Sequence, residues 1–169
     1  MQKIGFGGSC HWCTEAIFRS LDGVIRVEQG WISSDGQYKS PSEAVIVIFD
    51  EKQISLETLI AVHLHTHSCT AEHSMREKYR SAVYTFEAGQ TTFVKQAICE
   101  LQKDFDRPII TQALPFQAFR LNDSKYLDYY YADPSKPFCQ NIVNPKLKEL
   151  LNKFRKHIAS ERIPHLSNL

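Results

Sequence analysis

The chain has 169 residues, of which 43% are hydrophobic, and its 20 basic side chains nearly balance 19 acidic ones. This composition is typical of one globular domain over residues 1–169 with a sizeable buried core. The near-neutral charge, with no basic stripe, argues against nucleic acid or an anionic membrane surface as a partner, and the apolar runs are too short to span a membrane.

Hydrophobic periodicity predicts an alternation of strands and helices along most of the chain. In chain order we expect a strand at 3–6, a helix at 12–21, strands at 24–32 and 43–49, a helix at 56–67 capped by Ser55, a strand at 79–86, a helix at 88–105 and one or two strands within 109–121. Residues 124–158 read as helical but irregular, because three prolines interrupt them.

This order is β-α-β-β-α-β, the split pattern of an α+β protein. We therefore expect a two-layer sandwich with helices on one face of a sheet, followed by an irregular, partly helical C-terminal segment. The N-terminal residues hold no long apolar stretch of the kind that directs secretion, so a cytoplasmic location is expected. In that reducing setting, five cysteines favour thiol chemistry over a disulfide framework.

The most informative stretch is GGSCHWCTE at residues 7–15, which sets Cys10 between a strand and a helix. Glycines permit a tight turn there, and the first helical turn offers unpaired N–H groups and the positive end of the helix dipole to a thiolate. Such a setting lowers a thiol pKa. A buried cysteine that acts as a small hydrophobe is the alternative, and the polar, glycine-rich approach argues against it.

Several motifs together resemble one family. They are GGSCHWCTEAIF at 7–18, Gly23-Val24, Gln29-Gly30-Trp31, Glu43-Ala44-Val45, Tyr79-Arg80-Ser81-Ala82, Phe138-Cys139 and Asn144-Pro145-Lys146. In this order they are similar to the A-type peptide methionine sulfoxide reductases. The resemblance implies an oxidoreductase that reduces the S epimer of methionine sulfoxide, free or in proteins, uses no cofactor or metal, and is regenerated by thioredoxin.

The resemblance also implies roles for individual residues. A Cys10 thiolate would attack the sulfoxide sulfur and become a sulfenic acid. Glu43 would protonate the departing oxygen, and its place at the start of an apolar strand would favour the protonated form by desolvation. The alternative for Glu43 is a surface position on an edge strand. Tyr79 would polarise the sulfoxide oxygen, unless it is only a core aromatic.

The substrate-binding residues match the family less closely. Trp12 corresponds to a family tryptophan that helps form an apolar pocket for the substrate methyl group. His11 stands where the family has phenylalanine, so it could stack on the methyl group, ionise and alter the pH profile, or indicate a changed substrate. Tyr38 is assigned as a second tyrosine donor, although its loop is shorter than in the family.

Two cysteines compete to resolve the sulfenic acid. Cys139 matches the recycling cysteine of the family and is the preferred candidate. Cys13 forms a Cys-x-x-Cys pair with Cys10, a spacing that thioredoxin-like proteins use. Cys99, within a long helix, is expected to be a packed core thiol.

Two other functional classes remain open from the sequence. The run His63, His65, His67, Cys69 and His73 could form a zinc module, although histidines at a helix end more often bond terminal carbonyls. The departures near the substrate pocket also allow a catalytically impaired relative that binds partners or senses redox state through Cys10.

Overall fold

The computed structural model describes residues 1–166, and its centre is a six-stranded sheet in the order β5-β4-β1-β3-β2-β6. Its strands are β1 (Gln2–Gly7), β2 (Val24–Ser33), β3 (Ser42–Phe49), β4 (Ala82–Thr85), β5 (Gln112–Pro115) and β6 (Ala118–Leu121). Only β4 and β5 pair in parallel within this sheet; the other neighbours are antiparallel.

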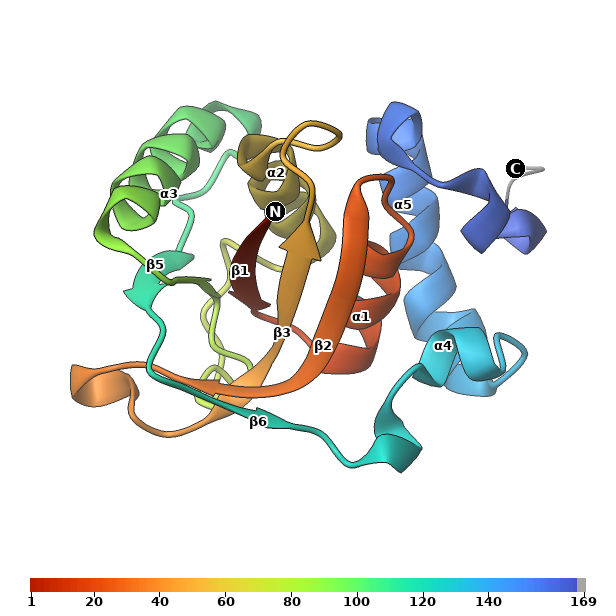
Figure 1. The fold of residues 1–169 in the computed structure, drawn as a ribbon, viewed down its shortest axis with the longest axis horizontal. Helices are drawn as coiled ribbons and strands as arrows, with labels where there is room; N and C mark the ends of the chain where they lie inside the picture. The colour runs from red at the N-terminus through yellow and green to blue at the C-terminus, as the bar shows by residue number, and fades with distance from the viewer. Residues whose placement is uncertain (167–169) are drawn as a thin grey trace.

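The helices are α1 (His11–Arg19), α2 (Leu56–Thr66), α3 (Ala88–Leu101), α4 (Tyr129–Ala132) and α5 (Asn144–Phe154). Helix α1 contacts β1, β2 and β3, while α5 packs on both α1 and α2. Figure 1 shows α1, α2 and α5 behind the strands, with the opposite face of the sheet turned to the viewer. The predicted α+β fold and its β-α-β-β-α-β order are confirmed.

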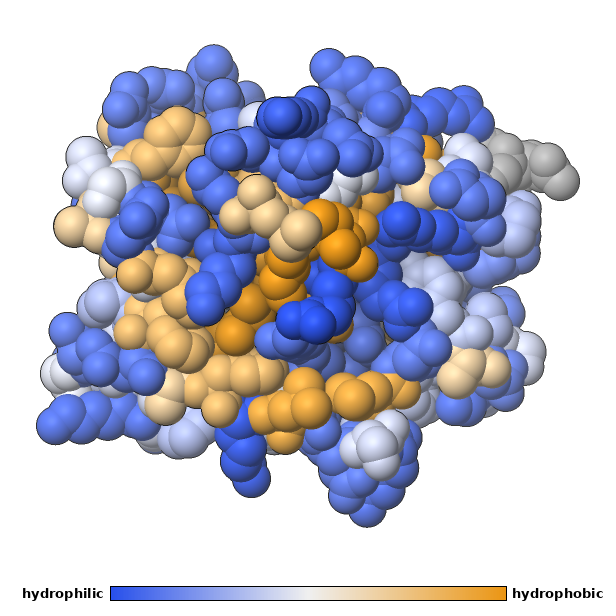
Figure 2. All heavy atoms as spheres, in the orientation of Figure 1, coloured by the Kyte–Doolittle hydropathy of each residue, from blue (hydrophilic) through white to orange (hydrophobic). Residues whose placement is uncertain are grey.

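The alternation of side chains along β3 explains why this strand reads as an unbroken apolar run. Val45, Val47 and Phe49 belong to the main core under the helices, whereas Ala44 and Ile46 belong to a second, smaller cluster on the other face. A strand with apolar neighbours on both faces loses the polar alternation of a half-exposed strand. Figure 2 shows the apolar side chains of that second face gathered over its centre and its lower edge.

Two expectations about local structure are wrong. The strand predicted at 79–86 is shorter, and Tyr79 lies outside it, because the Arg80 N–H donates to Ser42 Oγ (2.8 Å) instead of entering a strand ladder. Cys99 is exposed, not packed in the core. Helix α3 turns Val94 and Ala97 inward, and a residue two positions beyond Ala97 lies on the opposite side of a helix.

The C-terminal segment is irregular and partly helical, as predicted, and it returns to α1. Residues 139–143 form one π-helical turn that leads into α5. Further on, Ala159 N–H donates to Ser20 O (2.9 Å), and Asp22 N–H donates to His157 O (2.8 Å). None of the helices within residues 1–166 is long and apolar enough to cross a membrane.

Candidate active site

The site begins at the turn between β1 and α1, where Gly8 has a positive φ of 145°. A side chain there would be strained, and its Cβ would also lie 2.5 Å from the His67 ring. The turn brings Cys10 to the N-cap position of α1, where its carbonyl accepts hydrogen bonds from Cys13 N–H (3.1 Å) and Thr14 N–H (3.2 Å). Cys10 itself remains partly exposed.

The surroundings of Cys10 favour its thiolate. A hydrogen bond from the Cys13 thiol is the main cause that lowers the Cys10 pKa, and the backbone N–H groups of Trp12 and Cys13 add to it. Burial and the negative charge of Glu43 oppose this shift without reversing it. The same hydrogen bond, together with burial, raises the pKa of Cys13, so the proton stays on Cys13 and the charge on Cys10.

Glu43, the second residue of β3, is buried beside the nucleophile. Its Oε2 accepts a hydrogen bond from the His11 N–H (3.0 Å), so the carboxyl group is held against the first turn of α1. Its Oε1 lies 3.4 Å from Lys78 Nζ. The carboxyl group therefore meets the helix through one oxygen and the loop before β4 through the other.

His11 is buried at the centre of a polar network. Asn122 Nδ2 donates to Gln29 Oε1 (2.8 Å) and lies 3.1 Å from His11 Nε2, which makes that ring nitrogen an acceptor. The proton of the neutral ring is then on Nδ1, which lies 3.4 Å from Glu43 Oε2. Burial lowers the pKa of His11, while Glu43 partly opposes that shift, so the ring is neutral at pH 7.

Trp12 lies within an aromatic cluster. Its ring stacks on Tyr129, with centroids 4.1 Å apart and planes 6° from parallel, and the edge of Phe138 meets it at 5.5 Å. Tyr126 adds a tilted contact at 6.2 Å. These partners of Trp12 were not predicted from the sequence, although the run of three tyrosines at 129–131 was an available signal.

Tyr79 is half-buried, and its neighbour Lys78 lies between it and Glu43. The Lys78 ammonium lies 5.1 Å from the centroid of the Tyr79 ring and 3.4 Å from Glu43 Oε1. Tyr79 is therefore close to the Glu43 carboxyl group. Lys78 was not identified from the sequence, because an exposed lysine in a polar loop carries no local signal.

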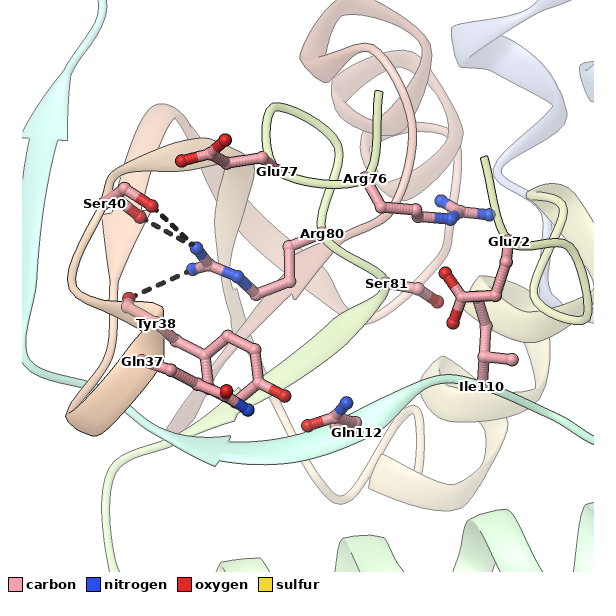
Figure 3. A pocket seen from close by; sticks show the side chains of 10 residues that line it. All are labelled: Gln37, Tyr38, Ser40, Glu72, Arg76, Glu77, Arg80, Ser81, Ile110 and Gln112. Carbon is pink, nitrogen blue, oxygen red and sulfur yellow. Dashed lines mark hydrogen bonds between the residues drawn. The ribbon is translucent and has the colours of Figure 1, made fainter. Parts of the chain in front are cut away.

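Tyr38 lies apart from these residues. It packs against the second apolar cluster, whereas Cys10 packs against the main core. There Tyr38 lines a pocket with Ser40, Arg80 and Gln112, and the Arg80 guanidinium sits over its ring at 5.1 Å (Figure 3). The structure therefore brings together Cys10, His11, Trp12, Glu43 and Tyr79, but not Tyr38.

Cys139 begins the π-helical turn and is fully buried in the main core, on which Cys10 packs. Burial raises its pKa. The turn that Cys139 begins contacts α1, the helix that carries Cys13.

The histidine run of α2 and the loop after it has internal partners. His67 Nε2 is 2.8 Å from Ser81 Oγ, and His65 Nε2 is 3.2 Å from Asp104 Oδ2. His63 is fully buried and stacks on His67 with centroids 4.2 Å apart. Across residues 1–166, no group of three or more His, Cys, Asp or Glu side chains is placed to hold a metal ion, so the zinc alternative gains no support.

Comparison with known proteins matches the chain to one family. A family model described as "Peptide methionine sulfoxide reductase" matches residues 2–159. The MsrA of Psychrobacter sp. (strain PRwf-1), named a peptide methionine sulfoxide reductase, is 31% identical over 94% of this chain and 99% of its own length.

Solved structures share the fold. The reduced form of Mxr1 from Saccharomyces cerevisiae superposes with a TM-score of 0.72 at 18% identity, covering 82% of this chain and 88% of Mxr1. A second Mxr1 structure, in complex with Trx2, gives a TM-score of 0.60 at 19% identity over 76% of this chain and 84% of Mxr1.

Proposed function

The chain belongs to the peptide methionine sulfoxide reductase family, and on that premise we propose that it reduces methionine S-sulfoxide through the Cys10 thiolate. The enzyme is thus an oxidoreductase that acts on methionine sulfoxide. One observation carries the mechanism: a thiol with a lowered pKa at the start of α1 lies beside a buried carboxyl group whose Oε2 is bonded to the next residue of that helix.

In the proposed reaction, the Cys10 thiolate attacks the sulfoxide sulfur while Glu43 protonates the sulfoxide oxygen. The protonated oxygen then passes to the Cys10 sulfur, and both the S–O bond of the substrate and the bond between the two sulfur atoms break, so methionine leaves with two more electrons and Cys10 carries the oxygen as a sulfenic acid.

The neighbouring side chains would bind the substrate. The Trp12 ring, fixed by Tyr129 and Phe138, offers an apolar surface for the substrate methyl group, and the neutral His11 ring adjoins it. The Tyr79 hydroxyl would polarise the sulfoxide oxygen next to Glu43. Tyr38 has no part in this arrangement, because it packs against the other face of the sheet.

Regeneration would use a second thiol of the chain and then thioredoxin, with Cys139 as a member of the internal disulfide. Mxr1, which shares the fold, forms a complex with Trx2. A reducing compartment such as the cytoplasm would keep these thiols available for the reaction.

The test follows methionine formation from the separate S and R epimers of a blocked methionine sulfoxide, with dithiothreitol as reductant. We expect turnover of the S epimer alone, and none with Cys10→Ser, because an alcohol supplies no thiolate at neutral pH. Cys99→Ser, on the exposed face of α3, is the matched control and should retain turnover. Reduction of the R epimer alone, or no reduction at all, would refute the proposal; if Cys10 were still readily alkylated, the redox-sensing alternative would gain support.

A further inference from the structure

A chain of hydrogen bonds leads from the second turn of α1 to the His11 ring, and each of its links has only one possible direction. Gln29 (0% exposed) donates through Nε2 to Tyr126 O (3.1 Å) and to Glu15 Oε2 (2.6 Å). A backbone carbonyl oxygen can only accept, so the Gln29 amide is fixed with its nitrogen on that side. Its Oε1 is thereby left as the acceptor that faces Asn122.

Asn122 is fixed in the same way by the residue that follows it. Its Oδ1 accepts a hydrogen bond from the Asp123 N–H (3.0 Å), so its Nδ2 donates to Gln29 Oε1 (2.8 Å) and lies 3.1 Å from His11 Nε2. An amide NH₂ group has only hydrogens to offer, so the contact between Asn122 and His11 requires an unprotonated Nε2. The hydrogen of the neutral ring is therefore held on Nδ1.

The Nδ1–H group of His11 points towards Glu43 without completing a hydrogen bond. Nδ1 is buried, has no hydrogen-bond partner within residues 1–166, and lies 3.4 Å from Glu43 Oε2, just beyond a good hydrogen-bond distance. The Gly30 carbonyl oxygen also acts on the ring and is the competing acceptor. A buried donor without an acceptor costs free energy, and a small shift of the Glu43 carboxyl group towards the ring would satisfy it.

The proposed reaction changes what Glu43 requires of its neighbours. Glu43 is a carboxylic acid before it protonates the sulfoxide oxygen and a carboxylate afterwards, and an N–H donor bonds more strongly to the carboxylate. Lys78 faces the other carboxyl oxygen at 3.4 Å, but its side chain is 46% exposed, so water screens that pair. The buried Nδ1–H of His11 is shielded from water and therefore stabilises the charge that develops on Glu43 in the transition state.

We propose that His11 is a positioning residue for the proton transfer from Glu43, and that Asn122 holds the His11 ring in the tautomer that can act. As the proton leaves, Nδ1–H donates to the Glu43 carboxylate, while the Asn122 amide keeps the hydrogen off the opposite ring nitrogen. This inference rests on the proposed function, because it concerns the proton that Glu43 delivers to the sulfoxide oxygen.

The tautomer is measured on the wild-type protein without substrate. Long-range nitrogen-15 to proton correlation spectra of protein labelled in its histidine rings show which ring nitrogen carries the hydrogen, and the signals lost in His11→Phe identify His11. We expect the hydrogen on Nδ1 alone at pH 7. A hydrogen on Nε2 of wild-type His11 would overturn the proposal.

The part played by Asn122 is tested with the same spectra. Asn122→Leu removes the amide donor at similar size, so a share of the His11 rings should carry the hydrogen on Nε2. Asn152→Leu, at an exposed position of α5, is the matched control and should leave the His11 signals unchanged. An unchanged tautomer in Asn122→Leu would show that Asn122 does not set it.

The role of the Nδ1–H group is measured in a single turnover. Reduced protein, in excess over blocked methionine S-sulfoxide and without reductant, forms methionine at the rate of the first chemical step. His11→Phe keeps a flat ring and removes the donor. We expect the maximal rate to fall about 10- to 100-fold, the range for a hydrogen bond to a charged group, with no change in the protein concentration that gives half that rate.

A double-variant cycle separates this role from a structural one. In Glu43→Gln no carboxylate forms, so adding His11→Phe should lower the rate no further. Near-UV circular dichroism establishes that each variant is folded. Equal losses in both backgrounds, or a wild-type rate in His11→Phe, would overturn the proposal. Wild-type protein that forms no methionine would instead refute the proposed function, so the two failures are distinguishable.

Discussion

Glu43 is bonded at Oε2 by a backbone N–H and approached at Oε1 by an ammonium group, and this fixed position gives the sharpest test of its role. Glu43→Gln should lower the rate of sulfoxide reduction by about 10²- to 10⁴-fold, the usual range for general acid catalysis. The comparison is with Glu77→Gln, an exposed glutamate of the loop that precedes β4, which should leave the rate unchanged.

Glu43→Gln should affect the reactivity of the Cys10 thiol in the opposite direction from the rate of sulfoxide reduction. The Glu43 charge raises the Cys10 pKa, so its removal should lower that pKa and leave alkylation of Cys10 at pH 7 as fast as in wild type or faster. The rate of iodoacetamide modification against pH measures this. A variant that reduces sulfoxide normally would remove Glu43 from the mechanism, and a variant that also loses alkylation would indicate a disrupted site.

Candidate site residues could be predicted from the sequence where the chemistry of the side chain and its neighbours along the chain point to the same role. Cys10 stands out because glycines and a helix start flank it, and Glu43 because it opens an apolar strand. Asn122 could not be found this way, since it reaches His11 only because β6 pairs with β2. The partial match of Tyr38 to a family tyrosine gave no information about which face of the sheet it would occupy.

At the scale of elements, Gly30 of β2 lies against β6 with no room for a side chain. A Cβ on Gly30 would collide with the backbone carbonyl of Arg120 and lie 2.7 Å from the Phe119 ring. Gly30→Ala should therefore separate β6 from β2, lower the free energy of unfolding by about 1–3 kcal/mol and speed hydrogen exchange of the β6 amides.

Gly89 is the matched control for that substitution. It lies in α3 with nothing within 4 Å of an added Cβ, so Gly89→Ala should raise the free energy of unfolding by about 0.5–1 kcal/mol. Urea unfolding of both variants measures the two values. A Gly30→Ala protein as stable as wild type would contradict the close approach of the two strands.

The elements that could be predicted are those with a strong periodic pattern. The apolar run of β3 and the Ser55 cap of α2, where Thr58 N–H donates to Ser55 Oγ (3.1 Å), both appear in the structure. The boundary of β4 could not be predicted. The Ser42 side chain binds the Arg80 N–H, and this long-range contact takes the backbone at 80 out of the sheet although its residues are typical of a strand.

At the scale of the whole molecule, buried neutral histidines make the free energy of unfolding fall at acidic pH. Burial lowers the pKa of His67 to about 4 and that of His63 well below its usual value. The unfolded chain binds these protons near pH 6.5, whereas the folded chain does not, so the free energy of unfolding falls as pH decreases from about 6.5 towards 4. His67 alone contributes a loss of about 3 kcal/mol over that window.

Urea unfolding between pH 6.5 and 5 tests this, because most carboxyl groups titrate below that range. His67→Gln should reduce the dependence of unfolding free energy on pH, and His73→Gln, an exposed histidine, should leave it unchanged. Equal slopes for wild type and His67→Gln would show that folding does not lower the pKa of His67.

The contacts between the C-terminal segment and the end of α1 make folding depend on the order of synthesis. Residues 157–162 supply bonds to Ser20, Asp22 and Arg19, so the helix that begins beside Cys10 is closed by segments translated much later. At about 5–20 residues per second, the interval lasts roughly 8–30 s. During that time the nascent chain carries Cys10 on a helix whose C-terminal end lacks these hydrogen bonds. A chain released before residue 157 never forms them.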